Sequence, residues 1–168
     1  MLERVRNGFR GGRRRPQVLE DIALRPIGVV RNRVTSTDSR DWRQVGSTII
    51  LEPELAPALL GLDSYSHIVV LSWLHGIPPD VRGSKLQLHP RDDPKNPLQG
   101  ILATRSQIRP NPIAMASVPL LGIRDNEIRV RGLDVIDGTP VLDIKPYLPP
   151  FDSVPAATMP AWVAGERA

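Results

Sequence analysis

Short apolar segments separated by turn-forming residues run along most of this chain, a pattern typical of β structure. Residues 67–74 form a nearly continuous apolar run that suits a buried strand. The polar break at 124–126 is typical of a hairpin turn. Strands do not alternate with long helical patterns, so we expect a mostly antiparallel sheet. The strand-like segments lie at 26–34, 47–51, 67–74, 85–88, 100–104, 113–121, 127–131 and 139–144.

Leucines recur at helical spacing only in residues 53–62, where we predict a short helix. Residues 76–100 contain five prolines, which predicts a long loop around the short strand at 85–88. Loops of that length in a compact domain are usually functional or mobile. The fold class is therefore mainly β, a single β-barrel-like antiparallel sheet with one or two short helices over residues 24–152. Residues 1–20 and 153–168 are expected to form tails, with Trp162 packing back onto the domain.

The net charge of +4 is concentrated at the start of the chain. Residues 1–15 contain six arginines and one glutamate, whereas the remainder has sixteen basic and seventeen acidic residues. An arginine-rich leader without apolar periodicity predicts disorder. Such a leader could contact the phosphate backbone of a nucleic acid. It could equally be a solvated tail, an organelle-targeting leader, or a segment translated from a start codon upstream of the true one. The sequence leaves these alternatives open.

Composition excludes several kinds of chemistry. The chain has no cysteine, which excludes disulfides, thiolate metal sites and a cysteine nucleophile. Its three histidines are too widely spaced for a helical metal motif, and we expect no metal site. No apolar run approaches the roughly 18–20 residues of a membrane helix. We therefore expect a cytoplasmic protein without a membrane partner.

Two segments, 103–113 and 134–147, place charged side chains within otherwise apolar sequence. Ionised groups in such surroundings resist burial unless they are paired or contact a ligand. Prolines in both segments fix the backbone, as a preorganised site requires. We therefore expect the functional site in these two segments.

Arg105 and Arg109 lie four residues apart on a strand-like stretch, which predicts that both point to one face. They would bind a carboxylate or phosphate, or form structural salt bridges with nearby aspartates. Asn111, between two prolines, would hydrogen-bond a base or stabilise an Asx turn.

The side chains of Asp143, Lys145 and Tyr147 alternate with apolar residues and proline, so all three are expected on one face of a strand. Such a row could transfer a proton during catalysis if Lys145 is desolvated beside Asp143 and Tyr147. A solvated surface row would produce the same pattern, and the sequence does not decide between them.

In order along the chain, several motifs match one family. They are Ser-His at 66–67, an apolar strand ending in Trp-Leu-His at 73–75, Ala-Thr-Arg-Ser at 103–106, Arg-Pro-Asn-Pro-Ile at 109–113 and Asp-Gly-Thr-Pro-Val-Leu-Asp-Ile-Lys-Pro-Tyr at 137–147. From about residue 27 to 152 the chain resembles the TrmO-type (TsaA-like) tRNA methyltransferases. Long motifs in a fixed order are more specific than one short pattern.

The resemblance implies a β-barrel methyltransferase that uses S-adenosylmethionine and acts as a homodimer. It implies methylation of the exocyclic amine of the threonylcarbamoyl-modified adenosine beside the tRNA anticodon, and a short form without the family's additional C-terminal domain. It assigns cofactor binding to Arg43, Gln44, His75, Gly76, Arg105, Met115, Val135, Ile136, Asp137 and Gly138. The residues expected to be catalytic are Asp143, Lys145, Tyr147, Asn111 and Arg109.

Three positions differ from residues common in the family: Trp42 and Gln107, where proline is frequent, and Ala114, where glycine is frequent. Two other functions are considered. One keeps the cofactor but methylates a small molecule or another RNA, and the other is a non-catalytic S-adenosylmethionine-binding regulatory module. The strand–Gly-x-Gly–helix signature of a Rossmann methyltransferase is absent from the sequence.

Overall fold

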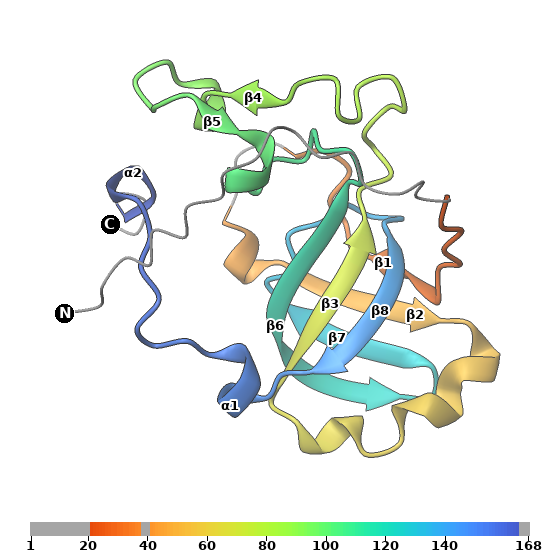
Figure 1. The fold of residues 1–168 in the computed structure, drawn as a ribbon. Helices are drawn as coiled ribbons and strands as arrows, with labels where there is room; N and C mark the ends of the chain where they lie inside the picture. The colour runs from red at the N-terminus through yellow and green to blue at the C-terminus, as the bar shows by residue number, and fades with distance from the viewer. Residues whose placement is uncertain (1–20, 38–40, 165–168) are drawn as a thin grey trace.

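The computed structural model describes residues 21–37 and 41–164. Within them, six strands close into an antiparallel barrel in the order β1-β2-β7-β6-β3-β8, with β8 pairing back onto β1 (Figure 1). The predicted β-barrel class is confirmed. The barrel strands are β1 (Gly28–Arg31), β2 (Gly46–Leu51), β3 (His67–Trp73), β6 (Ile113–Arg124), β7 (Glu127–Arg131) and β8 (Pro140–Pro146).

The core of the barrel follows from alternation along each strand. In β7, Ile128 and Val130 are buried while their neighbours in the strand are exposed, as expected when successive side chains point to opposite faces. Each fully buried valine or isoleucine contributes about 1.5–3 kcal/mol of hydrophobic stabilisation. All six strands supply such residues, among them Val30, Ile49, Val70, Val118, Val130 and Val141.

β6 closes the barrel by pairing with different strands along its length. It pairs with β3 through Pro119 and with β7 from Leu120 onward. The register shifts between Leu120 and Gly122, and also between Leu71 and Ser72 where β3 pairs with β8. Such irregularities bend strands and increase twist, which barrel closure requires. The buried Ser72 hydroxyl, at the second shift, has no hydrogen-bond partner among the described residues.

Beyond the barrel, a short two-stranded arm of β4 (Gln87–Leu88) and β5 (Gln99–Gly100) extends over the end where β3 finishes and β6 begins (Figure 1). The 3-10 helices are η1 (Trp42–Gln44), η2 (Pro53–Leu59), η3 (Leu62–Ser64), η4 (Pro90–Asp92) and η5 (Ile101–Ala103). Two short α-helices, α1 (Pro149–Asp152) and α2 (Ala161–Ala164), follow the barrel.

Several sequence predictions need correction. The single helix expected over 53–62 is replaced by two 3-10 helices, η2 and η3. Pro57, inside η2, has no backbone N–H with which to donate a helical hydrogen bond. The strand expected over 100–104 is wrong, because Thr104 Oγ1 donates to the Ile101 carbonyl oxygen and the segment coils into η5. The tail prediction for 1–20 lies outside the described residues. Trp162 is half-buried on α2.

Candidate ligand-binding site at one end of the barrel

A cavity of about 430 Å³ opens where β1 and β3 end and β8 begins. This volume falls in the range of small-molecule sites, which combine apolar walls with a few polar groups. Its lining comes from three loops that follow β1, follow β3 and precede β8, together with Gln107. The lining residues are Thr35, Ser36, Thr37, Leu74, His75, Gly76, Ile77, Gln107, Asp134, Val135, Ile136 and Thr139.

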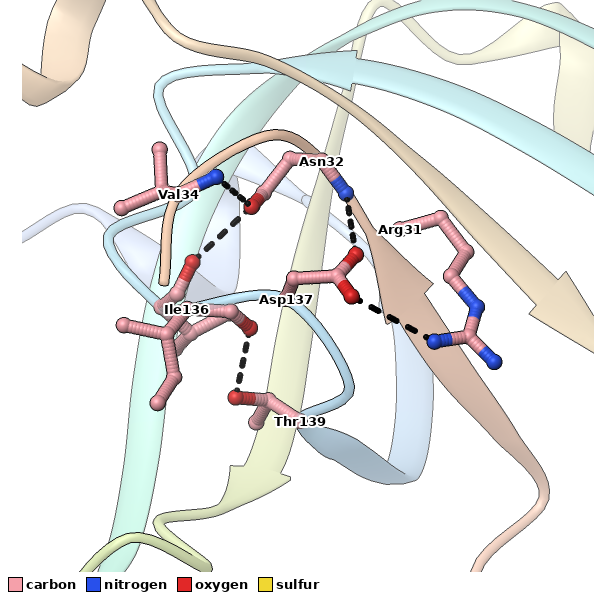
Figure 2. Close-up of polar contacts among 7 residues, drawn as sticks. Arg31, Asn32, Val34, Ile136, Asp137 and Thr139 are labelled. Atoms are coloured by element: carbon pink, nitrogen blue, oxygen red, sulfur yellow. Dashed lines mark hydrogen bonds and ion pairs between the residues drawn. The ribbon is translucent and has the colours of Figure 1, made fainter. Parts of the chain in front are cut away.

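Asn32 joins the loops that form this cavity (Figure 2). Its Nδ2 donates to Ser47 Oγ at 3.1 Å and to the Val135 carbonyl oxygen at 3.0 Å. Its Oδ1 accepts from the Val34 backbone N–H at 2.9 Å. One side chain therefore holds the cavity wall at Val135 against the end of β1. In the sequence, Asn32 is distinguished only as an amide at the end of an apolar strand, which did not predict this role.

Asp137 supports the same end of the barrel from the loop before β8. Its Oδ1 accepts from the Asn32 backbone N–H at 2.9 Å, and its Oδ2 lies 3.4 Å from Arg31 Nη1 (Figure 2). Gly138 follows with φ +78°, a left-handed conformation that glycine adopts without steric cost. The Thr139 hydroxyl donates to the Ile136 carbonyl oxygen at 2.8 Å and completes the turn.

Because the Asp137 carboxylate already has partners within the protein, the carboxylate that the cavity offers to a ligand is that of Asp134. Asp134 is exposed, lines the cavity and has no ion-pair partner among the described residues. Asp134 begins the segment 134–147, in which the sequence predicts the functional site, and is one of the aspartates near the two arginines. The sequence gives Asp134 no individual role, because residues 35–37 and 74–77, which complete its cavity, lie far away along the chain.

The structure brings together some of the residues predicted to bind the cofactor. His75, Gly76, Val135 and Ile136 line this cavity, and Asp137 and Gly138 form the adjoining turn. Arg105 lines a neighbouring cavity of about 840 Å³, which shares Ile77 and Gln107 with the first. The remaining predicted cofactor residues, Arg43, Gln44 and Met115, line neither cavity.

Arg43 and Gln44 lie on η1, which packs close to Gly132. A Cβ atom on Gly132 would lie 3.8 Å from the Arg43 Cα. The Arg43 Nε donates to Asp41 Oδ1 at 2.9 Å. This hydrogen bond lowers the pKa of the Asp41 carboxyl and raises that of the Arg43 guanidinium. η1 therefore lies beside Gly132, which is two residues before Asp134 in the sequence, and the Arg43 side chain faces solvent.

The segment from Arg105 to Arg109 is not the predicted strand. The Ser106 backbone N–H donates to Thr104 Oγ1 at 3.2 Å, and the Arg109 N–H donates to the Gln107 carbonyl oxygen at 2.9 Å. These local bonds take the N–H groups that strand pairing would use. The prediction that both arginines share one strand face is therefore wrong. Arg105 is exposed and Arg109 half-buried.

The predicted catalytic row lies on β8 and just beyond it. Lys145 Nζ contacts Asp143 Oδ2 at 2.7 Å, with side-chain exposures of 62% and 44%. Lys145 is thus not desolvated in the single chain. The Tyr147 ring lies 6.4 Å from the His67 ring, at the opposite end of the barrel from Thr139. None of the three residues lines either cavity, and neither does Asn111, which is exposed.

Neither a metal site nor a membrane-spanning helix is found in the part of the chain that the structure describes. Among residues 21–37 and 41–164, no group of three or more histidines or carboxylates is arranged to hold a metal ion. None of the helices in the same residues has both the length and the apolarity needed to cross a bilayer.

Comparison with known proteins gives consistent matches. Residues 32–153 match the family model described as the tRNA-methyltransferase O N-terminal domain. A probable S-adenosyl-L-methionine-binding protein of Methanothermobacter thermautotrophicus is 40% identical over 138 residues, covering 80% of this chain and 96% of that protein. The tRNA (adenine(37)-N6)-methyltransferase of Escherichia coli is 41% identical over 112 residues, covering 61% of this chain and 45% of that protein.

Solved structures agree with the sequence matches. The crystal structure of TrmO from Pseudomonas aeruginosa has a TM-score of 0.66 and 30% sequence identity, covering 83% of this chain. The chain spans 62% of that TrmO chain.

Proposed function

Because the chain belongs to the tRNA-methyltransferase O family, we propose that it is an S-adenosylmethionine-dependent methyltransferase whose acceptor is an adenine of tRNA. One observation carries this proposal. Four residues that the family resemblance assigns to the cofactor, His75, Gly76, Val135 and Ile136, come from two distant segments and line one cavity. The names of the related proteins support both the cofactor and the reaction.

The chemistry of the cavity fits an adenosyl ligand. Leu74, Ile77 and Ile136 offer apolar walls for a purine ring. The Asp134 carboxylate is an acceptor for ribose hydroxyls, because an ionised carboxylate only accepts hydrogen bonds. When bound, S-adenosylmethionine supplies an already activated methyl group, so the protein mainly aligns the acceptor and excludes water. The Asn32 and Asp137 contacts hold the loops for that alignment.

We infer more specifically that the acceptor is the exocyclic amine of the threonylcarbamoyl-modified adenosine beside the anticodon, in cytoplasmic tRNA. An exocyclic amine is a poor nucleophile and must lose a proton as the new N–C bond forms. Asp143, assisted by Lys145 and Tyr147, or the side chain of Asn111 is proposed to accept that proton. Arg105 and Arg109 are proposed to bind the anionic groups of the cofactor and acceptor.

The outer face of the barrel supports a homodimer. Met115 is 54% exposed on β6, and the strand register places it beside Leu71 of β3, which in turn lies beside Asp143 of β8. Met115 and Asp143 are thus on one face, and neither lines the two cavities described above, although Asp143 lines a separate cavity of about 510 Å³. We propose that this face contacts a second copy and brings these residues to the partner's site. Light scattering of the purified protein tests this, and a monomer mass would contradict it.

Binding and turnover together separate the proposed enzyme from a regulatory module. Calorimetry with S-adenosylmethionine should show one site per chain, and bulk tRNA should then accept labelled methyl groups. Binding without transfer to tRNA or to small-molecule acceptors would support the module instead. Methyl transfer to a small molecule but not to tRNA would support the proposed cofactor site and contradict tRNA as the methyl acceptor.

A further inference from the structure

A second, larger cavity of about 840 Å³ lies beside the candidate cofactor cavity. One wall comes from Lys85, Leu88 of β4 and residues 89–92 that follow it. Another comes from residues 102–108, and α2 contributes Trp162 and Val163. Ile77 and Gln107 line both cavities, so they form the boundary between them. A group bound in the larger cavity at this boundary would face a ligand in the smaller one.

The charged lining of the larger cavity favours an anionic ligand. Lys85, Arg91 and Arg105 line it, against the single carboxylate of Asp92. The Lys85 ammonium is exposed and has no ion-pair partner among the described residues. His89 is used structurally, since its Nδ1 lies 2.7 Å from the Asn96 carbonyl oxygen. Lysine binds phosphate as a point charge without demanding one geometry.

An aromatic side chain stands in the same cavity. Trp162 is half-buried on α2 and lines the cavity together with Lys85. An aromatic ring next to cations is the combination by which proteins hold single-stranded nucleic acid, with the base stacked and the backbone neutralised. Gln107 adds an amide at the boundary, which can both donate to and accept from a base edge.

We propose that this cavity is the acceptor site and takes one nucleotide of single-stranded RNA. Lys85 binds its phosphate, Trp162 stacks on the base, and Gln107 at the boundary directs the base edge toward the cofactor cavity. This inference rests on the proposed function, since it assumes an RNA acceptor. The RNA must present an unpaired nucleotide, as a tRNA anticodon loop does.

The test measures binding of an anticodon stem-loop RNA by fluorescence anisotropy at several salt concentrations. Lys85→Ala should reduce the slope of log affinity against log salt by roughly 0.7–0.9, the loss of one phosphate contact. Trp162→Ala should weaken binding about 5- to 150-fold, as expected for a lost stacking contact, and Trp162→Phe should restore most of it. S-adenosylmethionine affinity should be unchanged in all three variants.

Lys95→Ala is the matched control, because Lys95 is an exposed lysine on the same arm that does not line the cavity. It should keep the wild-type slope. If wild-type protein methylates tRNA while both Lys85→Ala and Trp162→Ala bind RNA like wild type, with the wild-type salt slope, the acceptor site lies elsewhere and the proposed function stands. Tighter RNA binding by Trp162→Ala would overturn the inference as well, because α2 would then obstruct the cavity. If wild-type protein neither binds nor methylates RNA, the proposed function itself fails.

Discussion

The backbone N–H of Asn32 donates to Oδ1 of Asp137 at 2.9 Å across 105 positions of sequence. This bond joins the end of β1 to the turn before β8, at the point where the barrel closes. The Asn32 side chain then extends to Val135 in the cavity wall. Closing the barrel and shaping the candidate site therefore depend on the same few contacts.

Asn32→Ala should weaken both the fold and cofactor binding. The variant loses three side-chain hydrogen bonds and leaves the Val135 carbonyl oxygen without its donor, which costs about 1–3 kcal/mol of unfolding free energy. Asn126→Ala is the control, because the Asn126 amide donates to the Leu51 carbonyl oxygen at the opposite end of the barrel. Denaturation and calorimetry should show both variants destabilised but only Asn32→Ala with weaker S-adenosylmethionine affinity. Equal cofactor affinities would show that Asn32 does not shape the site.

Arg105→Ala should lose cofactor affinity while its melting temperature stays near wild type. Arg105 is exposed and forms no ion pair among the described residues, so its removal leaves no charge unpaired within the protein. Arg124→Ala is the control for the loss of one positive charge, because the Arg124 side chain is 90% exposed and lies on the distant β6–β7 hairpin. A variant that melts much earlier and still binds the cofactor normally would identify Arg105 as structural.

Asp143→Asn should lower turnover by about 10²–10⁴-fold if the carboxylate accepts the amine proton. Cofactor affinity should change little, because only an interaction made in the transition state is lost. The fold should also survive, since an exposed pair such as Asp143–Lys145 contributes only about 0–1 kcal/mol. Steady-state kinetics at several pH values provide the measurement. A turnover that stays within about threefold of wild type would show that Asp143 is not the general base, because losing a general base lowers the rate far more. Asn111 would then be the better candidate.

The pair of Asp41 and Arg43 predicts a specific pH response. The hydrogen bond from Arg43 lowers the pKa of Asp41, so this contact stabilises the fold above the unfolded-state pKa and is lost as the pH falls through the lower folded value. A carboxyl-carbon NMR titration should place Asp41 below the usual aspartate range. Arg43→Ala should return it toward that range. An Asp41 pKa that is the same in both proteins would contradict the contact.

The sequence predicted strands best where the apolar pattern was long. The run at 67–74 became β3, and the polar break at 124–126 became the turn of the β6–β7 hairpin. The strand prediction failed at 100–109, where the Thr104 and Ser106 hydroxyls bind nearby backbone groups and replace strand pairing. The role of Asn32 could not be predicted, because its partner Val135 lies 103 positions away along the chain. Asp134 falls in the predicted segment 134–147, but its individual role depends on residues 35–37 and 74–77, which complete the cavity from distant parts of the chain.

The proposed function is tested most directly by nucleoside mass spectrometry of purified tRNA after incubation with this protein and S-adenosylmethionine. The substrate tRNA should carry the threonylcarbamoyl-modified adenosine and come from cells that lack the corresponding methyltransferase. We predict that this nucleoside gains one methyl group, at its exocyclic nitrogen, and that Arg105→Ala abolishes the gain. An unchanged nucleoside profile, from protein that calorimetry shows to bind S-adenosylmethionine, would contradict it.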